Sequence, residues 1–229
     1  MLLQQLRDRG FDIRCESHAA AILEKDFPVA LDELENILVS VQVPITEIIG
    51  SGGGETKGTQ RLRRALTQMG WRKGKFEIRK TINGIERQSI SHEIDHVREL
   101  NGDHLALEIE WNNKDPFFDR DLENFKRLHT EGAISVGIVV TRGHSLHERM
   151  HEMVLSFARD QGIGSIKNLR RIGLNPTSRQ MTAVTKRVER ERKPIEFATA
   201  WTDSFVSDKC SQAITAMDRK MATGGYHDR

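Results

Sequence analysis

Two Asn-Gly pairs constrain the fold more than any other feature of the sequence. An Asn-Gly pair between segments of alternating hydrophobicity is the strongest short-range signal for a β-hairpin, because both turn residues take a positive φ angle. Asn83-Gly84 and Asn101-Gly102 each lie between two such segments. They predict a three-stranded antiparallel meander with strands over residues 75–82, 85–99 and 104–111.

Helical patterns lie on both sides of this meander. Apolar residues recur at three- and four-residue spacing within the first 45 residues, and a basic helix is expected from Thr56 to Gly70. Asp115-Pro116 predicts the start of a further helix that ends at Gly132. The apolar run 133–140 predicts a buried strand, and another helix is expected over 145–160.

The second turn also predicts a register. A two-residue loop at Asn101-Gly102 places Leu100 opposite Asp103, so that Asp95 lies opposite Glu108 and Glu93 opposite Glu110. Because alternate residues share a face, one face should carry these four acids. The other face should carry a core made of Ile94, Leu105, Leu107, Ile109 and Trp111.

Four carboxylates on one sheet face should repel one another. Protonation or a bound cation relieves such repulsion, and oxygen-only ligands favour Mg²⁺. A metal held there can polarise a phosphate oxygen and lower the pKa of a bound water. The pattern therefore predicts metal-assisted phosphoryl hydrolysis. The alternative is a solvent-facing strand that merely carries acids, because the opposite face is strongly apolar.

The charge distribution is consistent with a polyanionic substrate. The formal net charge is only +2. Residues 56–76 hold seven basic residues and no acid, residues 167–193 hold nine basic residues and two acids, and residues 103–131 hold eight acids and four basic residues. Basic segments on either side of an acidic one suit a polyanion held around a metal site, although ordinary solvated faces also carry such charges.

Several classes of protein are not expected. No apolar run is long enough to span a membrane, and the N-terminal sequence is charged too early for a signal peptide. Cys15 and Cys210 match no zinc spacing and suggest free thiols in a cytoplasmic protein. The glycine run 52–54 lacks the Gly-Lys-Ser/Thr of a P-loop, so no nucleotide cofactor is expected.

The order of these elements resembles the PD-(D/E)XK nuclease core, in a variant with Glu-x-Glu as its last motif. The segment EIDHVRELNGDHLALEIEWNNKDPFF resembles the BamHI and BglII group of type II restriction endonucleases, and BglII-type proteins most. The resemblance covers about residues 50–142. It implies an α/β restriction-endonuclease-like fold, with a central mixed β-sheet and flanking helices. It also implies a single endonuclease domain with a helical N-terminal part, a catalytic core and a C-terminal part that contributes DNA recognition, over 1–50, 51–142 and 143–229.

The resemblance assigns roles to the acids. Asp95 would be the bridging metal ligand and Glu108 the second ligand, and the carbonyl of Ile109 is a candidate third ligand. Glu110 stands where most relatives have lysine and would orient or deprotonate the attacking water. Glu55, ahead of the basic helix, is a candidate for an additional helix-borne catalytic acid.

Two further assignments complete this hypothesis. Glu93 is a candidate metal ligand from the hairpin register alone, because the family motif does not require it. The side chains that suit base edges and phosphates are Lys57, Arg61, Arg64, Asn112, Asn113, Asn175, Ser178, Arg179, Lys186 and Arg187.

The activity implied by the resemblance is Mg²⁺-dependent hydrolysis of double-stranded DNA at a short palindromic site, leaving 5′-phosphates. Mn²⁺ is expected to substitute for Mg²⁺, and the enzyme is expected to act as a homodimer. Two alternatives remain at this stage: a repair or nicking nuclease on the same core, and a DNA-binding module that has lost catalysis.

Overall fold

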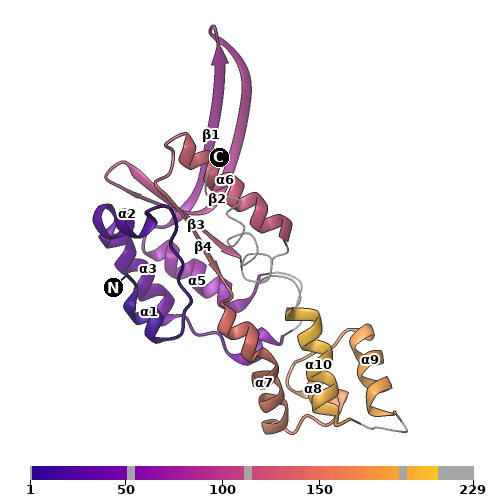
Figure 1. Cartoon of the computed structure of the whole chain (residues 1–229). Helices are drawn as coiled ribbons and strands as arrows, with labels where there is room; N and C mark the ends of the chain where they lie inside the picture. Colours follow the sequence, from indigo (N-terminus) through magenta and orange to yellow (C-terminus); the bar gives the residue numbers. More distant parts are fainter. Residues whose placement is uncertain (1, 51–54, 111–114, 191–194, 211–229) are drawn as a thin grey trace.

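A four-stranded mixed sheet forms the centre of the molecule (Figure 1). The computed structural model describes residues 2–50, 55–110, 115–190 and 195–210. The strands lie side by side in chain order, with the first three antiparallel and the last two parallel. This arrangement confirms the expected α/β fold with a mixed sheet. The strands are β1 (Arg72–Ile82), β2 (Ile85–Leu100), β3 (Asp103–Glu110) and β4 (Val136–Thr141).

The Asn-Gly pairs form both hairpin turns, as the sequence predicted. Asn83 and Gly84 have φ angles of 52° and 77°, and Asn101 and Gly102 have 55° and 90°. These left-handed conformations match the right-handed twist of the flanking strands, and asparagine and glycine adopt them at the lowest cost. The meander is therefore specified locally.

The N-terminal helices are α1 (Gln4–Asp8), α2 (Ala19–Asp26), α3 (Pro28–Ser40), α4 (Ile45–Ile48) and α5 (Lys57–Gln68). The helices other than α4 cover one face of the sheet, and α4 packs against the hydrophobic cluster of the C-terminal helices. Leu34, Leu66 and Trp71 are buried with Leu105 and Leu107 of β3 in one hydrophobic cluster. The expected basic helix is α5, whose N-cap Thr56 accepts a hydrogen bond from the backbone N–H of Thr59.

Helix α6 (Asp115–Thr130) packs on the other face of the sheet. Phe125 and Leu128 of this helix are buried with Ala106 of β3. Gly137 of β4 permits this contact, because a Cβ atom there would lie 2.5 Å from the ring of Phe125. The helix and the buried strand that follows it thus lie where the sequence predicted them.

The C-terminal helices extend from one end of the sheet (Figure 1). They are α7 (His144–Asp160), α8 (Ile166–Arg171), α9 (Ser178–Val188) and α10 (Phe197–Cys210). They have a hydrophobic cluster of their own, which also includes Ile49 from the end of the N-terminal part. Only α7 was predicted, because the pattern of apolar residues weakens after residue 160. Within the described residues, no helix is both long and apolar enough to cross a membrane.

Candidate active site

The β2–β3 hairpin has the predicted register. Leu100 pairs with Asp103, and the ladder continues to His96 and Leu107. One residue further along β2, the backbone N–H of Asp95 donates a hydrogen bond of 3.2 Å to Oε1 of Glu108. Asp95 and Glu108 are therefore neighbours, as the turn at Asn101-Gly102 predicted.

A β-bulge in β2 changes the expected arrangement of the other residues. Arg72 of β1 pairs with Val97, but Gly74, only two residues later, pairs with Ile94. The extra residue on β2 lies between Ile94 and Val97, and it reverses which residues face each side of the sheet. Two predictions about this strand are wrong as a result.

The first correction concerns Ile94, which was expected beside Leu105 and Leu107. It lies instead on the opposite face, buried with Ala106 and Phe125. The cause is the bulge. Side chains along a strand alternate between the two faces of the sheet, and the extra residue between Ile94 and Val97 shifts this alternation by one position.

The second correction concerns Glu93, which was expected opposite Glu110. Its backbone pairs with Lys75 of β1, and its side chain, 62% exposed, forms an ion pair with Lys73. The β2–β3 ladder ends before reaching Glu93. The bulge therefore separates this residue from the face that carries the other acids.

Glu108 and Glu110 are buried charged side chains at the end of β3. Their exposed fractions are only 6% and 4%. Burial, followed by the negative charge of Asp95, raises the pKa of Glu108 to about 8. Burial also raises the pKa of Glu110 well above its ordinary value, with contributions from Asp121 and then Glu108. A strand that merely carried acids toward solvent would leave these carboxyls exposed, so the alternative considered for this hairpin is wrong for Glu108 and Glu110.

Asp121 of α6 is a fourth acid at this site, and sequence reasoning missed it. It is 2% exposed and contributes to the raised pKa values of both Glu108 and Glu110. A signal was present in the sequence. Asp121 lies three residues after Phe118 and four before Phe125, so an acid occupies the apolar stripe of an amphipathic helix. Acids are almost never fully buried without a partner, which makes this position informative.

Lys73 is the second side chain that sequence reasoning missed. The motif places glutamate where most relatives have lysine, and the site therefore seemed to lack a cation. Lys73 enters from β1, where it forms an ion pair with Glu93. Its pKa is raised mainly by Glu93, with smaller contributions from the charges of Asp95 and Glu108. A positive charge therefore does lie near the acids, although it comes from the neighbouring strand.

His96 adjoins Asp95 on β2, and Glu55 lies at the start of the basic helix. Burial lowers the pKa of His96, which is next to Asp95, so this imidazole is neutral at pH 7. Glu55 lies ahead of α5 and forms an ion pair of 2.9 Å with Arg63 of that helix. The positive charge of Arg63 also contributes to the lowered pKa of His96, so Arg63 of α5 lies near the strand that carries Asp95.

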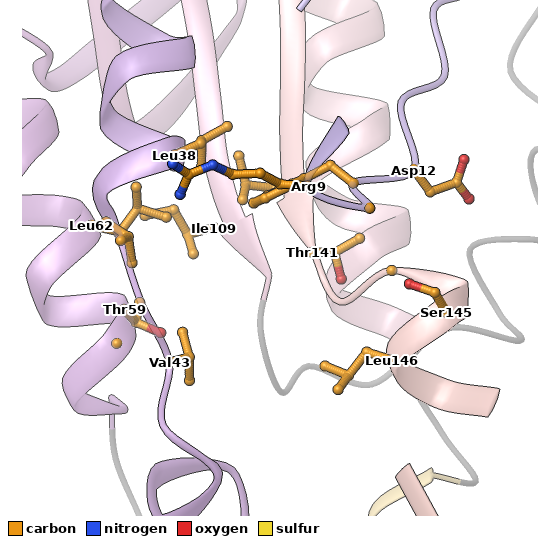
Figure 2. A pocket seen from close by; sticks show the side chains of 16 residues that line it. Arg9, Asp12, Leu38, Val43, Thr59, Leu62, Ile109, Thr141, Ser145 and Leu146 are labelled. Atoms are coloured by element: carbon orange, nitrogen blue, oxygen red, sulfur yellow. The ribbon is translucent and has the colours of Figure 1, made fainter. Parts of the chain in front are cut away.

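Ile109 points away from the acids. Its side chain lines a cavity of about 220 Å³ between the N-terminal helices and the C-terminal ends of β3 and β4 (Figure 2). Leu38 and Leu62 lie on one side of this cavity, and Thr141 and Leu146 on the other. The two glutamates on either side of Ile109 therefore face α6.

The candidate DNA-binding residues of α5 differ in availability. Lys57 and Arg64 are exposed. The guanidinium of Arg61 instead donates hydrogen bonds of 2.9 and 2.8 Å to the carboxylate of Glu47. Arg61 thus connects α5 to α4.

The remaining candidates lie after β3 and in the C-terminal part. Asn112 and Asn113 are outside the described residues. Arg187 forms an ion pair of 2.7 Å with Asp203 of α10, which connects two helices. The exposed candidates near α9 are Asn175, Ser178, Arg179 and Lys186.

The acids suit a divalent cation in their chemistry. Oε2 of Glu110 and Oδ2 of Asp121 are buried without a hydrogen-bond partner. Among the side chains that the structure describes, no three His, Cys, Asp or Glu groups are gathered closely enough to enclose a metal ion. Mg²⁺ does not require such an enclosure, since it keeps several waters and is often bound by one or two carboxylates and a substrate phosphate. These buried carboxylate oxygens without a hydrogen-bond partner therefore fit this ion.

Comparison with known proteins identifies the family. The model of the restriction endonuclease BglII/BglIII family matches residues 11–222, which is most of the chain. Neither the curated proteins nor the solved structures contained a match. The matched region extends well beyond residues 50–142, where the resemblance was first visible, and includes all the C-terminal helices. The chain therefore belongs to the BglII/BglIII family of restriction endonucleases, which are type II site-specific deoxyribonucleases that act on double-stranded DNA.

Proposed function

We propose that this restriction endonuclease hydrolyses DNA phosphodiester bonds with Mg²⁺ at the carboxylates of the β2–β3 hairpin, cuts at a short palindromic site and leaves 5′-phosphates. One observation carries the proposal. In a member of a DNA-cleaving family, Glu108 and Glu110 are buried, Glu108 lies beside Asp95, and an oxygen of Glu110 has no hydrogen-bond partner. Burial of acids is costly, and a site that binds a cation accounts for it.

Asp95 and Glu108 are the proposed metal ligands, together with the carbonyl of Ile109. When bound, Mg²⁺ would supply electrostatic stabilisation of the phosphate and lower the pKa of a coordinated water. Mn²⁺ should substitute, because it accepts the same oxygen ligands. Asp95 is exposed, so it can reach a substrate, and its backbone N–H orients the Glu108 carboxylate.

Glu110 is the proposed acceptor of the proton from the attacking water. Burial makes its carboxylate a stronger base than an exposed one, because the ionised form is disfavoured. Glu55 is proposed to assist from the start of α5, where Arg63 holds it. Glu93 is proposed only as an indirect participant, since it fixes the ammonium group of Lys73 near Asp95.

The enzyme is proposed to work as a homodimer in the cytoplasm. Two copies related by a two-fold axis match a palindromic site, and each copy cuts one strand. Residues 143–229 are proposed to contribute DNA recognition within a single endonuclease domain. Exposed Asn175, Ser178, Arg179 and Lys186 are suitable for this role, because their side chains can bond base edges and phosphates.

Plasmid cleavage tests this proposal. Wild-type protein with Mg²⁺ should convert plasmid DNA into discrete fragments, whereas Asp95→Ala should bind DNA without cutting it. Asp103→Ala is the matched control, because this acid lies on the same hairpin but is exposed at the turn. Nicked circles from the wild type would indicate a nicking enzyme, and binding without cleavage in any divalent metal would indicate a DNA-binding module. Normal cleavage by Asp95→Ala would exclude the assigned site.

A further inference from the structure

Asp121 is an unusual residue for the inner face of a helix. Helix α6 packs against the sheet through the apolar side chains of Phe125 and Leu128, and Phe118 of the same helix is also buried. Asp121 belongs to the same stripe and is 2% exposed. An apolar residue there would extend the core, so the carboxylate has a cost that some other contact must offset.

The hydrogen bond that the structure shows for Asp121 involves one of its two carboxylate oxygens. Nε of Arg120 donates a hydrogen bond of 2.9 Å to Oδ1. The side chain of Arg120 is 58% exposed, so this contact does not require a buried acid. Oδ2 is left buried without a donor, as is Oε2 of Glu110 on β3.

The carboxyl groups of Asp121 and Glu110 are neighbours across the interface between α6 and β3. They are close enough to form a side-chain hydrogen bond when one of them carries a proton. Two ionised carboxylates offer only acceptors to each other, so they need a group with positive charge between them. Two carboxylates with water and phosphate are a usual ligand set for Mg²⁺ and Mn²⁺.

We propose that Asp121 is a further ligand of the divalent cation, which it binds together with Glu110 across the α6–β3 interface. This inference rests on the proposed metal-dependent cleavage and adds a ligand from outside the strand motifs. It also gives Glu110 a second role, because the residue that accepts the proton from water is then held by the cation it shares with Asp121. Helix α6 becomes part of the site through this bond.

Cation binding by the full chain without DNA tests this inference. Mn²⁺ affinity is measured by calorimetry, and thermal unfolding is followed in chelator and in Mn²⁺. Asp121→Asn should weaken Mn²⁺ binding by about tenfold or more, which is the usual size for loss of a group that supports a metal. In chelator at about pH 9, above the pKa of Glu110, the same variant should unfold at a higher temperature than wild type, because the substitution then removes one of two facing negative charges. The two readouts thus move in opposite directions.

Two further variants make the result specific. Glu123→Gln removes a carboxylate from the same helix that forms a surface ion pair with Arg127, so its Mn²⁺ affinity should equal that of wild type. Glu110→Gln should weaken Mn²⁺ binding. The double variant of Glu110 and Asp121 should lose less affinity than the product of the two single losses, because both residues bind one ion.

Three results would overturn the inference. One is wild-type Mn²⁺ affinity in Asp121→Asn. Another is a lower unfolding temperature of that variant in chelator with an unchanged response to Mn²⁺, which would mean that Asp121 only holds Arg120. A wild-type protein that shows no response to millimolar Mn²⁺ would also overturn it. Cleavage of plasmid by the wild type is scored separately, so a failure of this inference is distinct from a failure of the proposed nuclease function.

Discussion

The two β-hairpins of this molecule begin from the same turn and end in different environments. Both use an Asn-Gly pair with positive φ angles. Around the first turn every residue from 79 to 89 is exposed, and the hairpin projects beyond the helices (Figure 1). Around the second turn the strands enter the core within a few residues, and Leu105, Ala106 and Leu107 have no exposed surface.

The acids on the two hairpins differ in burial and in pKa for this reason. Glu77 on the first hairpin is exposed, and a hydrogen bond from Arg79 lowers its pKa. Glu108 on the second hairpin is buried, and its pKa is raised to about 8. Residues of the same type on strands of the same sheet thus differ in the sign of their pKa shift, because one is solvated and paired and the other is desolvated beside like charge.

The largest expected effect is on DNA cleavage, which should depend on an acid of the second hairpin and not on an acid of the first. Glu108→Ala should reduce the rate of plasmid cleavage by at least about 10³-fold, or about 4 kcal/mol of transition-state stabilisation, because it removes a proposed metal ligand. Glu77→Ala should leave cleavage unchanged. Both rates are measured in single-turnover assays with Mg²⁺. Equal losses in the two variants would contradict the assignment of the site to the second hairpin.

The next effect is on stability as a function of pH. The folded protein holds the Glu108 proton up to about pH 8, whereas the unfolded chain releases it near 4.5. The folded state therefore binds more protons between these values, and the stability of the metal-free protein should fall as pH rises from about 5 to 8. The slope is about 1.4 kcal/mol per pH unit for each extra proton held.

Urea unfolding in chelator at several pH values measures this slope. Glu108→Gln should make it shallower, and saturating Mg²⁺ should do the same because the cation favours the ionised carboxylates. Glu77→Gln is the control on the first hairpin and should not affect the slope in this window, since its lowered pKa acts only near and below pH 4.5. A metal-free stability that rises from pH 5 to 8 would contradict the raised pKa of Glu108.

A smaller effect compares the turns themselves. Gly102→Ala and Gly84→Ala each place a Cβ in the left-handed region, although nothing lies within 4 Å of either position. The local cost is similar, roughly 1–2 kcal/mol. Gly102→Ala should lower the global unfolding free energy by about that amount, because the β2–β3 turn connects two core strands. Gly84→Ala should lower it by less, about 0.5 kcal/mol, since an exposed hairpin end can open without global unfolding.

Hydrogen exchange distinguishes these outcomes. In Gly84→Ala, faster exchange should be confined to residues near the first turn, whereas in Gly102→Ala it should extend to β3. Equal global destabilisation by the two variants would show that the projecting hairpin is as tightly coupled to the core as the second hairpin.

The smallest effect concerns the tip of the first hairpin. Ile82 and Ile85 flank its turn and are 59% and 56% exposed. Ile82→Ser and Ile85→Ser should change the unfolding free energy by less than about 0.5 kcal/mol, because little apolar area is buried there. Calorimetric unfolding of the free protein provides the measurement. A loss comparable to that in a core position would indicate that the tip is covered in solution.

Local sequence chemistry determined the second hairpin and the pairing of its acids. The Asn101-Gly102 turn fixes the register through backbone conformations that only a few residues adopt, so the neighbourhood of Asp95 and Glu108 could be predicted. The order of helix, meander, helix and strand could also be predicted from the sequence, since each type of element has its own hydrophobic period. Extending the register from the same turn gave the wrong position for Glu93, because this extension assumes that the strand contains no bulge.

Only the tertiary structure decided the rest of the site. The bulge between Ile94 and Val97 turned Glu93 toward Lys73, and bulges have no signal in a strand of alternating residues. Helix α6 brought Asp121 to Glu110 from outside the motif. Burial of Glu108 and Glu110 raised their pKa values, and desolvation depends on every element packed around a group rather than on its neighbours in sequence. The sequence by itself thus determined which acids are paired on the hairpin, and packing determined which of them are buried.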